Sequence, residues 1–564
     1  MSRILGVLLG CAMLMWVIGC GGGSSAPAPT PTPTPSAGAA TVTTTSTTVP
    51  LSSTQLFTAT NFSAAVTWSV NPAIGSINAN GIYQAPATFP TPNTVTVTAT
   101  AGAQTASDTI TIVFPNDNAT SEATPVKLGT SGGNTADVGA KVCCIGTMGS
   151  LWSRADLGQV ILSNNHVLDR SSLGVPGESI TQPGPSACFP GQSKPIANLS
   201  FGAPLAPAGT TQGRVGASPS NTDSAIAAVV PGAVDPTGTI LDLGAAGSTS
   251  IAAAQPSATI ATPSLPMSVA KSGRTTGLTC STVSSIKADI QVDYETSCGS
   301  NVTAFTATYR GQVMIAGGSF SAGGDSGSLV VNSVNAQPVA LLYGGSPTDT
   351  VANPLLDDVD SVGNPAPGVI TALSSGANHL TLVGGTDHAV SCAPTAVTNA
   401  KQVGALSTGV PLSATESQRI TAVQQKNRGL LMQNSAISSL AIGGSADSPS
   451  EGALIIHLSH ASAVPIPAVM DGVRTRVVFD QDGVSQPSVG QAQIDRAAVV
   501  KDAHVSEYLG QPGIQGVGVA ISSDNPAETA ISIYVIKGVS HQIIPPVIDG
   551  VRTKIFEGER FKAF

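Results

Sequence analysis

The sequence predicts a mainly β protein that is divided into several domains. A chain of 564 residues is too long for one hydrophobic core. Charged residues make up only 10% of it and aromatic residues 4%, whereas Ser, Thr, Gly, Ala and Val abound. This composition favours short strands and turns over long charged helices. The net charge of -9 supplies no basic field for a polyanion, so we expect no nucleic-acid partner.

Residues 1–20 have the layout of an export signal, with Arg3 before an apolar run that is short for a bilayer span. The last four residues of this segment, Val-Ile-Gly-Cys, resemble a bacterial lipobox. We therefore expect Cys20 to be acylated and the protein to be exported as a lipoprotein, anchored to the cell-envelope membrane by lipid alone, on its periplasmic or cell-surface face. The alternative is an ordinary signal peptide that is cut nearby.

Residues 21–39 are rich in Pro, Thr and Ser and should form an extended linker. In residues 40–115, short alternating segments are separated by Asn, Gly and Pro, which predicts a β-sandwich. The pattern VTWSVNPAIGSINANGIYQAPA resembles bacterial immunoglobulin-like repeats. Trp68 within it is expected to anchor the core.

The C-terminal part of the chain contains a repeat. The segment VPIPAVMDGVRTRVVF at 464–479 recurs as IIPPVIDGVRTKIF at 543–556. Each copy is preceded by a helical stretch and by strand-like segments, so the sequence predicts two α+β repeats, at residues 415–484 and 492–564.

Both repeats carry the sequence Asp-Gly-Val-Arg-Thr. Its arginines, Arg474 and Arg552, could bind an anion. We expect them instead to pair with the neighbouring Asp471 and Asp549, because adjacent opposite charges usually do so.

Six cysteines would remain after export and lipidation, in an oxidising compartment: Cys143, Cys144, Cys188, Cys280, Cys298 and Cys392. None has the C-x-x-C spacing of a zinc site, so disulfides are expected and no metal. Cys280 and Cys298 flank one short segment and are predicted to bond to each other. Cys188 is predicted to bond either Cys143 or Cys144, since adjacent cysteines rarely bridge without strain. Cys392 would be left over or would bond the other vicinal cysteine.

Residues 125–392 carry three side chains with complementary chemistry. His166 follows an apolar strand in VILSNNHVLDR, Asp223 enters one in SNTDSAIAAVV, and Ser326 lies in the turn SFSAGGDSGSLVV. A serine hydroxyl becomes a nucleophile when an imidazole takes its proton and a carboxylate orients the imidazole. The glycine-rich turn would let the backbone N–H groups of Gly324 and Ser326 form an oxyanion hole.

The segments SNNHVL, NTDSAIA, KSGRTTGLTC and AGGDSGSLV, in this order, resemble the chymotrypsin-fold (trypsin-like) serine peptidases. More narrowly, they resemble bacterial relatives of the plant narrow-leaf peptidase group. The resemblance implies two antiparallel barrels of six strands with the site between them. It also implies that His166 is the general base and then acid, Asp223 the orienting carboxylate and Ser326 the nucleophile, with no cofactor.

The same resemblance places the floor of the substrate pocket at Phe320, six residues before Ser326, and its wall in ALLYGGS, with Tyr343 and Gly344. There is no acid to pair with a basic substrate side chain, and no wall histidine of the kind that glutamate-specific relatives carry. A weak preference for small or apolar residues follows. The acidic run LLDDVD at 355–360 is expected to be solvated rather than to bind calcium.

The sequence therefore predicts an exported, lipid-anchored serine endopeptidase that acts on proteins or peptides through an acyl-enzyme. The immunoglobulin-like domain would precede the catalytic domain, and the two repeats would follow it. The alternative is a surface adhesion or binding protein whose peptidase-like domain is an inactive scaffold.

Overall fold

The computed structural model describes residues 39–113, 115–138, 144–205, 220–295, 300, 302–392, 412–480 and 488–564. The predicted signal peptide with Cys20 and nearly all of the linker lie outside these residues. The chain forms two compact units. Within the described ranges, no helix combines the length and the apolar character needed to cross a membrane.

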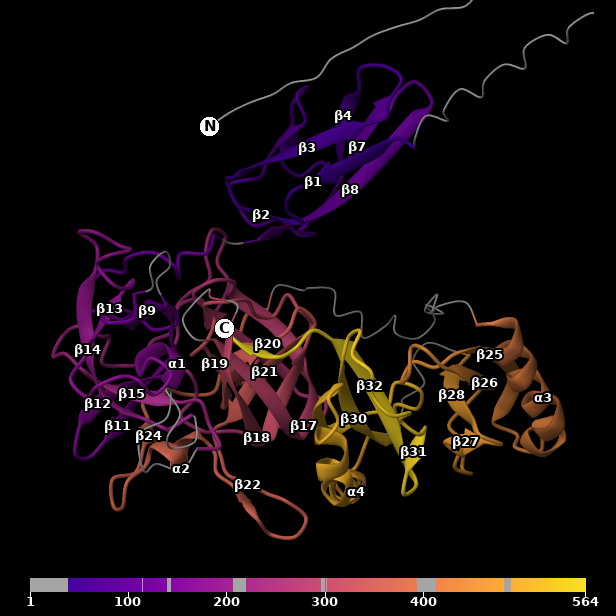
Figure 1. The fold of residues 1–564 in the computed structure, drawn as a ribbon. Helices are drawn as coiled ribbons and strands as arrows, with labels where there is room; N and C mark the ends of the chain where they lie inside the picture. Colours follow the sequence, from indigo (N-terminus) through magenta and orange to yellow (C-terminus); the bar gives the residue numbers. More distant parts are fainter. Residues whose placement is uncertain are drawn as a thin grey trace, which may run out of the picture. The chain divides into compact units, whose positions relative to one another are not determined.

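Two four-stranded sheets make up residues 39–113 (Figure 1). The first has the order β1 (Thr41–Thr44), β3 (Thr54–Thr60), β6 (Ile82–Gln84), β5 (Ser76–Ile77), and the second β2 (Thr48–Pro50), β8 (Gln104–Val113), β7 (Thr94–Ala101), β4 (Thr67–Asn71). Strand β7 buries every second residue, Val95, Val97, Ala99 and Ala101, as its alternating sequence predicts. Trp68 is half-buried, with its ring centroid 6.4 Å from that of Phe57. The immunoglobulin-like assignment stays a prediction.

The first sheet of the second unit has eight strands and follows the order β10, β9, β13, β14, β15, β12, β11, β24. Their bounds are β9 (Thr130–Asn134), β10 (Gly146–Met148), β11 (Ser150–Arg154), β12 (Gly158–Ser163), β13 (Ser179–Gln182), β14 (Lys194–Gly202), β15 (Ala225–Val229) and β24 (Thr381–Leu382). It surrounds a core that includes the fully buried Trp152 and Leu162. The sheet exceeds the predicted six strands partly because β24 returns from much later in the chain to pair with β11.

The second sheet has eleven strands, in the order β16, β19, β20, β21, β18, β17, β29, β30, β32, β31, with β33 pairing β17 and β20. Their bounds are β16 (Ser268–Gly273), β17 (Gly277–Glu295), β18 (Thr303–Ala316), β19 (Leu329–Asn332), β20 (Pro338–Gly345), β21 (Asp349–Pro354), β29 (Ile514–Ile521), β30 (Thr529–Ile536), β31 (Val547–Ile548), β32 (Val551–Gly558) and β33 (Lys562–Ala563). Strand β29 of the second repeat pairs antiparallel with β17. The second repeat therefore continues the sheet and its core, in which Ala497 and Ile533 cluster with Val283 and Leu342.

The two repeats have the same order of elements. The first consists of α3 (Ala414–Leu431), β25 (Ile437–Gly444), β26 (Gly452–Leu458), β27 (Val469–Met470) and β28 (Val473–Phe479), and the second of α4 (Gln491–Leu509) followed by β29, β30, β31 and β32. In each repeat the first two strands are antiparallel, and the second strand is parallel to the last. Figure 1 shows each helix beside its own sheet.

The predicted pairing of the repeat arginines is wrong. Arg474 Nε lies 2.7 Å from Glu451, and Arg552 Nε lies 2.6 Å from Glu528. The guanidinium of Arg474 also donates to Thr553, and that of Arg552 to Thr475, so each arginine reaches across to the other repeat.

The two aspartates sit in the turn before each arginine, with left-handed backbone angles. Asp471 (φ 45°) accepts hydrogen bonds from Lys426 and Asn427, and Asp549 (φ 44°) contacts His504. Their partners therefore come from the helix of their own repeat.

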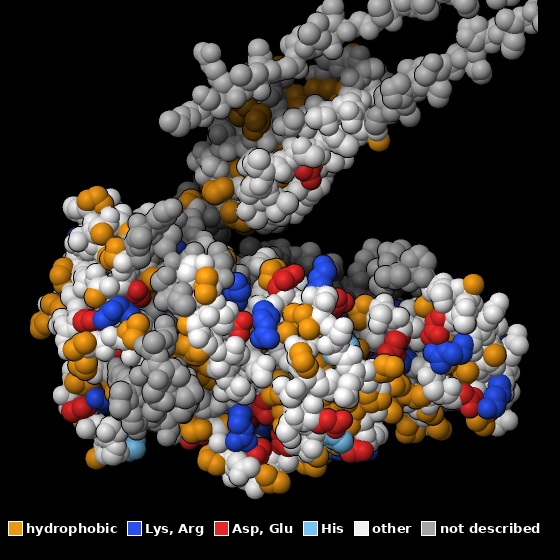
Figure 2. Space-filling model, viewed as in Figure 1, with side chains coloured by type: hydrophobic (Ala, Val, Ile, Leu, Met, Phe, Trp, Pro, Cys, Tyr) orange, Lys and Arg blue, Asp and Glu red, His pale blue; other side chains and the backbone are white. Residues whose placement is uncertain are grey.

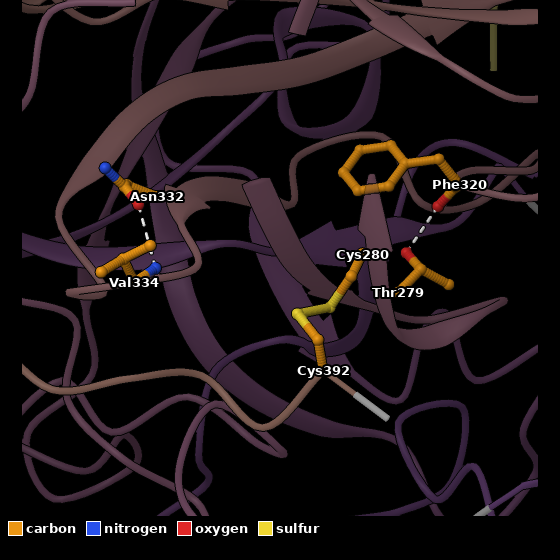
Figure 3. Close-up of a disulfide and its surroundings, with 6 residues drawn as sticks. All are labelled: Thr279, Cys280, Phe320, Asn332, Val334 and Cys392. Carbon is orange, nitrogen blue, oxygen red and sulfur yellow. Dashed lines mark hydrogen bonds between the residues drawn. A yellow bond between two sulfur atoms is a disulfide. The ribbon is translucent and has the colours of Figure 1, made fainter. Parts of the chain in front are cut away.

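The predicted Cys280–Cys298 disulfide is also wrong, because Cys280 bonds Cys392 (Figure 3). Cys280 lies within β17, a strand of 19 residues, rather than at the start of a short loop. The observed bond spans 112 residues and would stabilise by about 4–5 kcal/mol on the chain-entropy model. Cys144 and Cys188 are disulfide-bonded too. Cys143 and Cys298 lie outside the described residues, so the pairing of Cys188 stays a prediction.

Aspartates of the acidic run at 355–360 form ion pairs with basic side chains. Strand β22 (Asp358–Val359) pairs with β23 (Pro365–Ala366), and α2 (Val369–Leu373) follows. Asp358 lies 2.5 Å from Lys287, and Asp360 lies 2.6 Å from Arg310. Across the face shown in Figure 2, acidic and basic side chains are interspersed and sparse, in keeping with the low charged content of the sequence.

Candidate active site

Two neighbouring strands of the first sheet bring His166 and Asp223 together. Strand β12 runs antiparallel to β15 with Ser163 opposite Ala225. The helix α1 (Asn165–Leu168) begins just after β12, and Asp223 lies just before β15. Nδ1 of His166 is 2.5 Å from Oδ2 of Asp223, and the His166 backbone N–H donates to Oδ1 at 3.2 Å. The pair predicted from the sequence is therefore present.

Asp223 is fully buried, and a buried carboxylate is costly unless its oxygens accept hydrogen bonds. Tyr294, from β17 in the second sheet, donates to Oδ2 at 2.8 Å and shares a 2.6 Å hydrogen bond with Tyr309. Asn164 and Asn353 hold the backbone of Asp223 through its carbonyl oxygen. Burial, followed by the charge of Asp223, raises the pKa of Tyr294 well above its ordinary value, so the phenol stays a neutral donor.

The surroundings of His166 favour its protonated form. Burial lowers the pKa of His166, but the charge of Asp223 and the hydrogen bond to it more than offset burial. The net pKa lies above the ordinary value of 6.5. The Phe564 carbonyl and the more distant Asp137 also raise it. Burial raises the pKa of Asp137 itself to about 6, against the opposing charges of Arg170 and His166.

Ser326 lies in a turn that only glycine neighbours permit. Gly324 (φ 98°) and Gly327 (φ 93°) both have left-handed backbones. A Cβ on Gly327 would lie 2.1 Å from the Ser163 Oγ. The Ser326 carbonyl accepts a hydrogen bond from the Thr147 N–H at 2.7 Å, which attaches the turn to the first sheet. The turn thus sits where the eight-stranded and the eleven-stranded sheets meet.

The side chain of Asp325 organises this turn from inside. Its Oδ1 accepts the backbone N–H groups of Thr275 and Thr276, and its Oδ2 accepts that of Ala322. The Lys271 ammonium lies 3.3 Å from Oδ2, and both side chains are fully buried. Burial lowers the pKa of Lys271, and Asp325 opposes that shift. Sequence reasoning missed this ion pair, although a lone lysine in the apolar strand SVAKSG was a visible signal.

The backbone N–H groups of Gly324 and Ser326 are the predicted oxyanion-hole donors, and this role stays a prediction. Among the described residues, no acceptor bonds to the backbone N–H of Gly324 or of Ser326. Two unpaired N–H groups that flank a nucleophile can bind an oxygen that becomes negative.

Ser326 and His166 converge on one carbonyl oxygen, that of Phe564. Ser326 Oγ donates to it at 3.0 Å, and His166 Nε2 lies 3.0 Å from it. Within the described part of the chain, no hydrogen bond joins Ser326 directly to His166; Ser326 Oγ instead lies 3.3 Å from the Tyr343 carbonyl. All three predicted residues therefore meet at one place, which the end of the chain also reaches.

The predicted pocket residues lie on and beside β20. Phe320 is buried in the core of the second sheet, and its carbonyl accepts a hydrogen bond from Thr279 (Figure 3). Tyr343 is buried too, with its ring 5.3 Å from that of Tyr309. Gly344 faces Lys562 of the C-terminal segment. Their roles in a substrate pocket stay predictions.

A scan against protein-family models gives no match, and a search of curated proteins gives none either. Among solved structures, the chain is similar to a glutamic acid specific serine protease that uses a histidine triad in substrate binding, with 17% identity and a TM-score of 0.27 over 41% of this chain and 93% of that one. It is also similar to a Cellulomonas bogoriensis chymotrypsin (15%, TM-score 0.24, 41% and 91%). A Nocardiopsis protease is comparable (16%, TM-score 0.25, 41% and 92%). At these identities and TM-scores, the likeness carries no inference about activity.

Proposed function

We propose that this chain is a serine endopeptidase that hydrolyses peptide bonds through an acyl-enzyme. The observation that carries the proposal is the convergence of Ser326 Oγ and His166 Nε2 on one backbone oxygen, that of Phe564, each at 3.0 Å, with His166 Nδ1 held by the buried Asp223. A nucleophile, a base and an orienting carboxylate in this arrangement suit acyl transfer.

In the first half of the reaction, the neutral His166 takes the proton of Ser326 Oγ at Nε2 while Oγ bonds the substrate carbonyl carbon. The imidazolium then gives this proton to the leaving nitrogen as the C–N bond breaks, which leaves an ester on Ser326. In the second half, water loses a proton to His166 and attacks the ester carbon. The imidazolium returns this proton to Ser326 Oγ as the C–O bond breaks, which frees the acid and restores the serine. Asp223 keeps the other proton on Nδ1 and stabilises the imidazolium.

The negative charge that develops on the substrate carbonyl oxygen requires hydrogen-bond donors. The N–H groups of Gly324 and Ser326 would supply them, and in other enzymes the removal of one such donor costs about 2.7–4 kcal/mol. The Asp325–Lys271 pair would keep these N–H groups in position, since it fixes the turn that carries them.

The proposal includes export with a lipid anchor on Cys20, which the signal-like N-terminus supports and which suits a protein with disulfides. A Cys20→Ser variant should leave the membrane fraction or remain unprocessed. Unchanged processing and membrane partition would contradict the anchor without touching the proposed activity.

Labelling with a fluorophosphonate tests the activity directly. The probe should modify Ser326, as read by peptide mapping, and should not label a Ser326→Ala variant. Ser319→Ala is the matched control, because Ser319 is exposed in the same loop. Equal labelling of parent and Ser326→Ala would overturn the proposal. So would a folded parent that is not labelled even after residues 562–564 are removed, and the inactive-scaffold alternative would then hold.

A further inference from the structure

The end of the chain forms a strand beside Ser326 and His166. Strand β33 pairs antiparallel with β20, Gly344 opposite Ala563 and Gly345 opposite Lys562. The Phe564 N–H donates to the Tyr343 carbonyl at 3.3 Å, which continues the same pairing. Figure 1 shows the C-terminus reaching β20. The next polar group along the segment is the Phe564 carbonyl, which meets Ser326 and His166.

Two glycines of β20 leave room for this close approach, and Gly345 is also crowded by the Asp349 carbonyl oxygen of β21. A Cβ on Gly344 would lie 2.4 Å from the Lys562 carbonyl oxygen, and one on Gly345 would lie 3.0 Å from Cζ of Phe564. Neither glycine has a positive φ, so it is space, and not backbone conformation, that favours glycine here. The Phe564 ring therefore packs against the backbone of β20.

The second repeat positions residues 562–564 beside Ser326 and His166. Phe561 is buried in a cluster with Tyr294, Tyr309 and Tyr343. Its N–H donates to the Gln515 side chain at 2.9 Å, and its carbonyl accepts from the Asp293 N–H at 3.0 Å. Because β29 of the same repeat is paired to β17, residues 562–564 start from a fixed point.

We propose that residues 562–564 occupy the substrate cleft as an intramolecular peptide, with Phe564 in the place of the residue whose carbonyl Ser326 attacks. The segment then inhibits the site, and its sequence indicates the preferred substrate, a peptide with an aromatic residue on the acyl side of the cleaved bond. Strand addition of this kind draws affinity from main-chain hydrogen bonds and specificity from side-chain contacts. The inference rests on the function proposed above for the same site.

The segment also disables the base. Nδ1 of His166 must donate its proton to the Asp223 carboxylate, since a carboxylate only accepts. A hydrogen bond from Nε2 to the Phe564 carbonyl requires a second ring proton, because two acceptors would repel. The occupied site therefore holds an imidazolium, which cannot take the proton of Ser326.

The rate of fluorophosphonate labelling tests the inhibition. We compare the full chain, a chain that lacks 562–564, Phe564→Ala, and Glu559→Ala as the control. Glu559 is exposed and precedes the cleft, whereas the deletion keeps the buried Phe561. The deletion should raise the labelling rate constant at least tenfold and Phe564→Ala should raise it less, while Glu559→Ala should match the full chain. Circular dichroism checks folding, and Phe564→Ala keeps the test valid if the deletion does not fold.

Two further arms test occupancy and specificity. Acetyl-Lys-Ala-Phe should slow labelling of the deleted chain at millimolar concentrations, which is about the effective concentration of a tethered segment. Acetyl-Lys-Ala-Glu should not. On the deleted chain, kcat/KM for a peptide nitroanilide that ends in Phe should exceed that for one that ends in Lys or Glu at least tenfold.

The outcomes separate the two proposals. Equal labelling of Ser326 in the full and the deleted chain overturns the inhibition and leaves the peptidase standing. If no form of the chain is labelled, the peptidase proposal fails. Binding of fluorescein-Lys-Ala-Phe then tests only whether residues 562–564 occupy the site. Binding of this peptide to the deleted chain but not to the full chain supports occupancy of the site by residues 562–564. Binding to neither chain overturns it. A preference for Lys or Glu over Phe overturns the substrate assignment.

Discussion

Tyr294 donates a 2.8 Å hydrogen bond to Oδ2 of Asp223 across the junction of the two sheets. The same oxygen faces Nδ1 of His166, so a residue of the second sheet sets the position of a pair that belongs to the first. The relative placement of the sheets and the geometry of the site are therefore linked through one carboxylate.

Tyr294→Phe should lower kcat/KM by about 10- to 100-fold, because a hydrogen bond to a charged group contributes about 1.5–3 kcal/mol. KM should change little, since the hydroxyl contacts Asp223 and not the cleft. Steady-state kinetics on the chain without 562–564 measures this effect. Tyr534→Phe, which alters another buried tyrosine of the same cluster, is the control. An equal loss in both variants would show that Tyr294 acts through packing alone.

Lys271→Met should destabilise the protein by about 3–5 kcal/mol, because it leaves the buried Asp325 without its cation. Urea unfolding at neutral pH measures the change. The exposed pair of Lys426 and Asp471 offers a control, and Lys426→Met should leave the unfolding midpoint unchanged. Labelling of Ser326 should also slow, since Asp325 fixes its turn. A Lys271→Met protein as stable as the parent would show that the ion pair does not stabilise the fold.

Non-reducing peptide mapping should find Cys280 linked to Cys392. Cys392→Ser should lower the free energy of unfolding by about 2–5 kcal/mol, as the loss of a native disulfide in a secreted domain does. The measurement compares urea unfolding of the variant with that of the parent under oxidising conditions. Recovery of Cys280 linked to any other cysteine would contradict the structure.

The pH dependence follows from the raised pKa of His166. The protonated ring cannot act as a base, so the acid limb of kcat/KM in the full chain should lie above the ordinary histidine pKa of about 6.5. The groups that face the ring are Asp223, Tyr294, Asp137 and the Phe564 carbonyl. Deletion of 562–564 removes the last of these and should move the limb to lower pH.

The hydrogen bond between residues 562–564 and His166 has the same direction of pH dependence. This bond to the imidazolium is fully present below the ordinary pKa and is lost as the pH rises through the raised one. Activation by the deletion should therefore be larger at pH 6 than at pH 9, as rate ratios at the two pH values would show. A ratio that is independent of pH would contradict a charged His166 in the occupied site.

The sequence was sufficient to predict what depends on short segments. His166, Asp223 and Ser326 lie in local patterns of strand ends and glycine turns, and the structure brings them together. The repeats were visible because similar residues recur at a fixed offset. These features need no knowledge of which strands become neighbours.

What was missed depends on long-range pairing. Tyr294 reaches Asp223 only because the two sheets meet, and Cys280 meets Cys392 across 112 residues. The repeat arginines were assigned to adjacent aspartates, whereas the fold offers each a glutamate that directly precedes the neighbouring strand and a threonine of the other repeat. The β17–β29 pairing, which holds the second repeat so that Phe564 reaches Ser326 and His166, leaves no local signal either.

Cleavage by variants of Ser326, His166 and Asp223 is the most direct test of the proposed peptidase activity. In the chain without 562–564, Ser326→Ala and His166→Ala should each abolish hydrolysis of a Phe-containing peptide nitroanilide to a similar residual rate, because triad members act as a unit. Asp223→Asn should lower kcat by roughly 10⁴ through the wrong imidazole tautomer. We expect this pattern in variants whose circular dichroism spectra show that the fold is intact. A Ser326→Ala protein that cleaves the substrate at the rate of its parent would contradict the proposed activity.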